Sequence, residues 1–88
     1  MEEQKIGVVT HFFGHISVAA IKIEEDTLKV GDTVHFKGHT SDFKQKIKSM
    51  QIDHAEISEA KAGDDLAIKV KKHVRENDVV YKVTEEQK

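Results

Sequence analysis

Six histidines are the residues whose spacing first suggests chemistry in this chain. His11 and His15 are four residues apart, and so are His35 and His39. On an α-helix such a pair can hold zinc, but here a glycine interrupts each pair and the flanking residues are those of strands and turns. Neither first histidine is followed by the glutamate of a metalloprotease motif. We therefore expect exposed strand or turn histidines, no metal and no cofactor, and keep a small metal hydrolase as a third hypothesis.

Nucleophilic and acid–base catalysis have little support in the sequence. None of the four serines lies in a Gly-x-Ser-x-Gly elbow, and the chain has no cysteine. The acidic runs at residues 24–26 and 64–65 are typical of turns rather than of paired buried carboxylates. The phosphate loop of nucleotide hydrolases is also absent. We therefore predict that the chain is not an enzyme and binds no nucleotide.

Basic residues offer a binding surface instead. They fall into two groups, Lys37, Lys44, Lys46 and Lys48 in the first, and Lys69, Lys71, Lys72 and Arg75 in the second. Phe43 lies inside the first group, where it could stack on the bases of a single-stranded RNA end or close the mouth of the core. The candidate RNA- or partner-binding residues are Lys37, Phe43, Lys44, Lys46 and Lys48. The alternative interpretation is a set of solvated outer strand faces.

Length and composition limit the chain to one small domain. Its 88 residues allow a single core, which we expect from about Lys5 to Val83 within a domain over residues 1–88, with frayed tails. Hydrophobic residues make up 38% and charged residues 34%, with a net charge of −2. That balance is not the strongly basic one of a bulk nucleic-acid binder. Short apolar runs and the polar start "MEEQK" predict no membrane association and a cytoplasmic location.

The elements that position these residues are predicted to be strands. Apolar residues alternate with period two along residues 16–23, 33–37 and 66–71, the pattern of half-buried strands. Residues 5–13 and 78–83 are rich in β-branched and aromatic side chains. Along residues 43–52 the phase slips, which predicts a bulge near Ser49 and Met50. The segment 53–63 reads as a connector with room for one helical turn.

Glycine and aspartate mark the turns between these strands. Gly31-Asp32 and Gly63-Asp64 are expected to reverse the chain, and Gly31, Gly38 and Gly63 to supply positive φ angles or close approaches. About six short strands at spacings of roughly 8–14 residues follow from this reading. The residues thus predict a small all-β barrel or sandwich.

An ordered set of short motifs resembles the second-domain β-barrel of translational GTPases such as elongation factor Tu and initiation factor 2. The motifs are Gly7-Val8-Val9, Leu28-x-Val30-Gly31-Asp32-x-Val34, Ile47-x-Ser49-Met50, Ala62-Gly63-Asp64 with Leu66-Ala67-Ile68, and Arg75-x-x-Asp78-Val79-Val80. A free-standing version looks like the small translation elongation factor-like proteins, and similar barrels accompany some peptidases of the collagenase-like U32 type. The resemblance implies a translation-protein domain-2-like fold, a six-stranded antiparallel Greek-key β-barrel in which a residue larger than Ala62 or Gly63 would crowd the wall.

The resemblance also implies a function. It points to a non-catalytic binding module that contacts tRNA, ribosomal RNA or a protein of the translation apparatus, with the family's acceptor-end pocket near residues 47–50 and 63–68. The chain has no nucleotide domain, and its first hairpin, "THFFGHIS", departs from the family's Gly-rich form. The alternative is a protein-interaction accessory domain that docks on a larger enzyme such as a U32-type peptidase.

Overall fold

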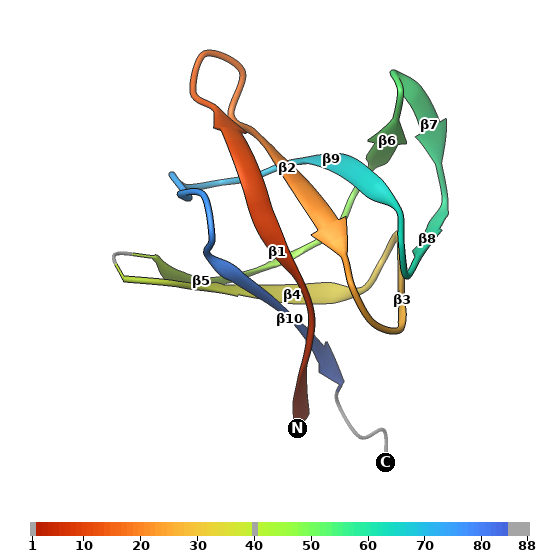
Figure 1. The fold of residues 1–88 in the computed structure, drawn as a ribbon, viewed down its shortest axis with the longest axis horizontal. Coiled ribbons are helices and arrows are strands. Elements are labelled where there is room, and N and C mark those ends of the chain that lie inside the picture. The colour runs from red at the N-terminus through yellow and green to blue at the C-terminus, as the bar shows by residue number, and fades with distance from the viewer. Residues whose placement is uncertain (1, 40, 85–88) are drawn as a thin grey trace.

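Antiparallel β-strands make up the described part of the chain, residues 2–39 and 41–84 of a computed structural model (Figure 1). The strands are β1 Glu2–Phe13, β2 Val18–Ile23, β3 Thr27–Lys29, β4 Thr33–Lys37, β5 Asp42–Lys46, β6 Met50–Ile52, β7 Ala55–Ile57, β8 Glu59–Lys61, β9 Asp65–Lys69 and β10 Val79–Thr84. These residues contain no helix, so the helical turn expected within residues 53–63 is wrong. That segment forms β7 and β8 instead. It follows that no described helix has the length and apolar character needed to cross a membrane.

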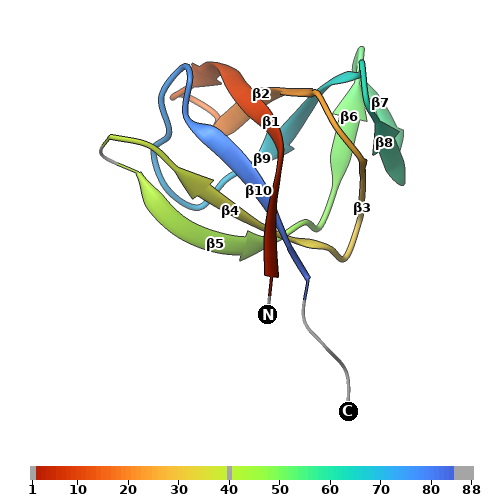
Figure 2. The same cartoon turned by 60° about the horizontal axis from the view of Figure 1, so that its bottom comes forward.

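One large sheet forms most of the molecule. Its order is β5-β4-β10-β1-β2-β9-β6-β7, and β3 pairs with β8 in a second, two-stranded sheet. Every pairing is antiparallel, and the large sheet curls around the core (Figure 2). The all-β class is confirmed. The closed barrel of six strands is wrong, because the sheets hold eight and two strands and the described edge strands β5 and β7 do not pair.

After β5 the chain crosses to another part of the same sheet, and β5 is left as an edge strand. The expected bulge near Ser49 and Met50 is replaced by a break at residues 47–49, which carries the chain from β5 across to β6 beside β9 (Figure 1). Ile47 anchors this crossing. Its side chain is 1% exposed, and its backbone bonds to Gly31 and Asp32 of the β3–β4 turn at 2.8 Å each. The phase slip in the sequence therefore marks a change of sheet position rather than an extra residue in one strand.

The period-two pattern sends one side of each strand into a single core. On β2 the inward residues are Ala19, Ile21 and Ile23, on β4 Val34 and Phe36, and on β9 Leu66 and Ile68, all at most 3% exposed. β1 departs from simple alternation, because its register shifts between Lys5 and Gly7 and again between Val9 and His11. Bulges of this kind bend a strand. They allow Ile6 and Val9 on β1 both to reach the core.

One turn design occurs three times, at residues 29–32, 61–64 and 75–78. In each, the third residue has positive φ: +100° at Gly31, +97° at Gly63 and +76° at Asn77. The closing aspartate donates its backbone N–H to the first residue's carbonyl oxygen at 2.9–3.1 Å. Its carboxylate accepts the first residue's backbone N–H at 2.9–3.0 Å. A Cβ built on Gly63 meets nothing within 4 Å, so the expected crowding is absent and the φ angle is what requires glycine.

The described chain begins and ends at the same end of two neighbouring strands in the middle of the large sheet. Glu2 pairs with Thr84, and β1 and β10 run side by side (Figure 2). Residues 2–4 and Thr84, expected as parts of the tails, thus belong to β1 and β10. Residue 1 and residues 85–88, the rest of the expected tails, lie outside the described residues.

Candidate binding surface

The candidate residues of β5 divide between its two faces, because Lys44 and Lys46 are exposed whereas Phe43 is buried. Phe43 is 8% exposed, and its ring stacks on Phe36 with centroids 5.2 Å apart and planes 27° apart. The ammonium group of Lys72 lies 5.9 Å from the centroid of the Phe43 ring. In this structure Phe43 therefore packs in the core rather than offering an open face to a base.

Two of the candidate lysines lie next to acids. Lys37 on β4 is directly opposite Asp42 on β5. The ammonium group of Lys44 lies 3.6 Å from a carboxylate oxygen of Glu3. Opposite charges in such positions offset one another, so Lys37 and Lys44 add little net positive potential to this face.

His35 on β4 is the one buried histidine of the six, at 8% exposed. Its Nδ1 lies 2.8 Å from Glu3 Oε1, and its Nε2 lies 2.5 Å from Asp42 Oδ1. A carboxylate faces each ring nitrogen, so the protonated ring can donate a hydrogen bond on both sides. The expectation of exposed histidines is thus wrong for His35, because two acids compensate its burial.

The cluster shifts the pKa of all three groups. Burial lowers the pKa of His35, but the hydrogen bonds to Asp42 and Glu3 together outweigh it and leave the pKa above its ordinary 6.5. The hydrogen bond from His35 lowers the pKa of Glu3 below 4.5 and that of Asp42 below 3.8. The histidine contribution to stability is therefore complete below pH 6.5 and fades as the pH rises through its folded pKa. The carboxylate contributions fade as the pH falls, so the cluster stabilises the fold most between about pH 4.5 and 6.5.

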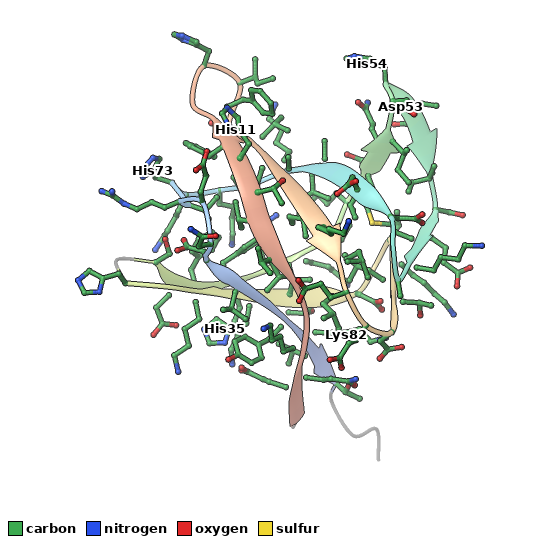
Figure 3. The ribbon with its side chains drawn as sticks, viewed as in Figure 1. His11, His35, Asp53, His54, His73 and Lys82 are labelled. Carbon is green, nitrogen blue, oxygen red and sulfur yellow. The ribbon has the colours of Figure 1, made fainter. Side chains whose placement is uncertain are left out.

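This cluster is not arranged for catalysis. Both nitrogens of His35 are occupied by carboxylates, so neither can take a proton from a nucleophile. Of the histidines labelled in Figure 3, His11 and His73 lie near the β1–β2 hairpin, whereas His54 at the β6–β7 turn and His35 on β4 lie apart from them and from each other. Within residues 2–39 and 41–84, no group of three or more His, Cys, Asp or Glu could hold a metal ion.

The structure brings parts of the two basic groups of the sequence together around one cleft. The cleft has a volume of about 450 Å³. It is lined by Gln45, Lys46, Lys48, Ser49, Lys69, Val70 and Lys71. We call it the basic cleft. It lies where the edge strand β5 faces the end of β9, two strands that do not pair.

Gln45 holds the two sides of the basic cleft together. The side chain is 8% exposed; its Nε2 donates to the Lys69 carbonyl oxygen at 2.7 Å, and its Oε1 accepts the Lys71 backbone N–H at 2.9 Å. One carboxamide thus makes two hydrogen bonds to backbone groups, in place of the backbone hydrogen bonds that a neighbouring strand would supply. Sequence reasoning missed Gln45, although the alternation of β5 puts it on the same inward side as Phe43. A polar residue on an apolar face needs a partner, and that signal could have found it.

The lysines of the basic cleft lack the acidic neighbours seen elsewhere. Among the described residues none of Lys46, Lys48, Lys69 and Lys71 forms an ion pair, and no acid lines the cleft. Lys46 lies opposite Thr33, and Lys69 lies opposite Val18. By contrast, on the β2–β9 and β3–β8 pairs a lysine faces an acid directly: Lys22 faces Asp65, and Lys29 faces Glu59. Positive potential therefore concentrates at the cleft.

The comparison with curated proteins finds a similarity to part of a protease. No family model matches the chain. It is 40% identical over 82 residues to an uncharacterized protease of Methanocaldococcus jannaschii, a match that covers 92% of this chain and 20% of the protease. The chain thus spans about a fifth of the length of this curated relative.

Solved structures show the same fold. The C-terminal domain of a Geobacillus thermoleovorans protein assigned to the U32 peptidases superimposes with a TM-score of 0.85 at 20% identity, covering 92% of this chain and 93% of that domain. Its selenomethionine variant gives a TM-score of 0.82, also at 20% identity, and covers 88% of this chain and 96% of the domain. At this identity the likeness establishes the fold.

These relatives overturn the resemblance to translational GTPases. The interpretation as a translation elongation factor-like protein with an elongation factor domain 2 is wrong, and tRNA, ribosomal RNA and translation partners find no support. The motifs misled because the turns at 29–32 and 61–64 are requirements of backbone geometry, which unrelated families can share. What the chain matches is a single all-β domain of peptidase-type proteins.

Proposed function

We propose that this chain is a non-catalytic, protein-binding accessory domain of the kind that U32-type peptidases carry. The proposal rests on how much of each similar protein the chain matches. The chain matches about a fifth of a protease but nearly all of a solved C-terminal domain. The segment matches a whole domain in one comparison and a small part of a protease in the other. This proportion fits an accessory module joined to a larger catalytic body.

The chemistry of the described residues supports a non-catalytic role. The basic cleft contains a serine, Ser49, but no histidine or carboxylate to activate it. An unactivated hydroxyl is a weak nucleophile. The buried His35 is committed to Glu3 and Asp42 on both nitrogens.

Reconstitution in two parts tests this role. The Methanocaldococcus relative would be produced without the segment that this chain matches, checked for folding by circular dichroism, and mixed with the 88-residue chain. We expect a one-to-one complex by size-exclusion chromatography with light scattering. A folded protease body that forms no complex at tens of micromolar would contradict the docking role.

An activity assay tests the non-catalytic part. The chain alone should leave casein and denatured collagen intact during prolonged incubation, with the relative as the comparison. Hydrolysis that co-purifies with the chain and is lost in a Ser49→Ala variant would contradict a purely binding role.

A further inference from the structure

We infer that the basic cleft receives an acidic, extended segment of the peptidase body. This inference rests on the proposed function, because it names the surface through which the domain would contact that body. The first observation in its favour is the positive charge of the basic cleft. Four lysines without ion pairs among the described residues line one cleft, and no acid is among the lining residues. Like charges brought together repel, and an anionic occupant relieves the repulsion.

The shape of the cleft favours a polypeptide over a single ion. Its lysines come from three segments: β5, the crossing at 47–49, and residues 69–71, which begin at the last residue of β9. A volume of about 450 Å³ falls within the range of sites for ligands of several dozen atoms. Lysine stems and Val70 provide apolar walls below the ammonium groups. A chain segment with several carboxylates can pair with charges spread in this way, while its own stems pack on those walls.

The position of the cleft favours the attached body as the source of that segment. Glu3 pairs with Val83, Val83 with Thr33, and Thr33 with Lys46, so these four residues form one row across the sheet. Three strand spacings separate Lys46 from Glu3, roughly 14 Å at the usual distance between strands. A body joined at the outer end of β1 or β10 therefore lies within reach of the cleft, about four to five extended residues away.

The same surface is poorly suited to nucleic acid. Single-stranded nucleic acids bind through a basic groove combined with exposed aromatic rings. The lining of the basic cleft contains no aromatic residue, and the nearby Phe43 is buried against Phe36. The chain also carries a net charge of −2. Charge pairing with protein carboxylates is the chemistry that remains.

Two variants with equal net charge test the cleft. The cleft variant carries Lys48→Gln, Lys69→Gln and Lys71→Gln. The control variant carries Lys22→Gln, Lys29→Gln and Lys61→Gln, three exposed lysines outside the cleft lining. The probe is a fluorescein-labelled peptide of eight glutamates, compared with a neutral Gly-Ser peptide and a single-stranded RNA octamer. We expect the cleft variant to lose about tenfold in affinity for the acidic peptide and the control less than about threefold.

Nuclear magnetic resonance locates the contact. Backbone amides of residues 46–49 and 69–71 should shift on titration with the acidic peptide and stay in place with the neutral one. Equal losses in the two variants would reduce the effect to bulk charge and overturn the inference. Tighter binding of the RNA octamer through the same amides would overturn it as well.

The two-part complex separates this inference from the proposed function. If the truncated relative binds the wild-type chain and the control variant but not the cleft variant, both statements stand. If it binds all three equally, the cleft inference fails while the docking role survives. If it binds none of them, the docking role itself fails.

Discussion

The strand order leads to a direct prediction of how much the Gln45 carboxamide contributes to stability. β5 is an edge strand and has no ladder to β9, and among the described residues the Gln45 side chain hydrogen-bonds β5 to residues 69–71. Replacing Gln45 by leucine keeps a similar volume but removes one donor and one acceptor. The backbone carbonyl of Lys69 and the backbone N–H of Lys71 then lose these partners.

The expected cost follows from those two bonds. Each contributes about 0.5–1.5 kcal/mol net, and a backbone group left without a partner in a partly buried place costs more. The leucine recovers part of the loss by burying apolar surface at a position that is 8% exposed. We expect Gln45→Leu to lower the free energy of unfolding by about 2–3 kcal/mol, out of the roughly 4–13 kcal/mol typical of a chain of this size.

Urea unfolding followed by far-ultraviolet circular dichroism measures the loss. Gln51→Leu is the control, because Gln51 on β6 is exposed, and it should change the free energy by no more than about 0.5 kcal/mol. Hydrogen exchange gives the local readout: the Lys71 amide should exchange faster in Gln45→Leu even when conditions equalise global stability. A stability loss below about 0.5 kcal/mol, with unchanged Lys71 exchange, would refute the bridging role.

Three further predictions address other parts of the fold. His35→Gln should reduce stability most between about pH 4.5 and 6.5 and less toward either side, which unfolding curves at several pH values would reveal; a difference that keeps growing toward pH 9 would contradict it. His54 has φ +68° in the two-residue β6–β7 turn, so His54→Gly should raise the free energy of unfolding by up to about 1 kcal/mol, and a drop in melting temperature would count against the strain. A Cβ on Gly7 would collide with the backbone carbonyl of Lys22, so Gly7→Ala should destabilise by about 1–3 kcal/mol. Gly14→Ala is its control, because that Cβ meets only a Phe12 ring carbon at 3.7 Å; equal effects of the two substitutions would show that packing is not the cause.

The secondary structure could be predicted where a strand has one buried face. Alternation along residues 18–23 and 33–37 identified residues that are fully buried, such as Ile21 and Phe36. It works there because the pleat puts every second side chain on the core side. β7 and β8 gave no such signal, since each has only three residues and most of them are exposed.

The arrangement of the strands could not be predicted in the same way. Residues 43–52 contain a phase slip, but a slip alone does not distinguish a bulge from a crossing to another part of the sheet. The choice depends on long-range bonds, such as those between Ile47 and the turn at 29–32. The burial of His35 likewise depends on Glu3, which is distant in the sequence and close in space.

The candidate site was predictable in residue type but not in grouping. Both basic groups could be read from the sequence, yet only Lys46 and Lys48 of the first group line the cleft, together with Lys69 and Lys71 of the second. These lysines lie together because β5 faces the end of β9, and no local sequence pattern indicates that arrangement. The binding role of the candidate lysines Lys37, Lys44, Lys46 and Lys48 stays a prediction, and the cleft variant described above tests Lys48 among them.

The pairing of Glu2 with Thr84 has a consequence for how such a domain can be reused. Two ends on adjacent strands are only about 5 Å apart, so the unit can be spliced into a surface loop of a host without stretching either side. The same closeness permits circular permutation, with the old ends joined by a short linker and new ones cut at an exposed turn. A host would then be joined to the unit at one end of β1 and β10, two neighbouring strands in the middle of the large sheet.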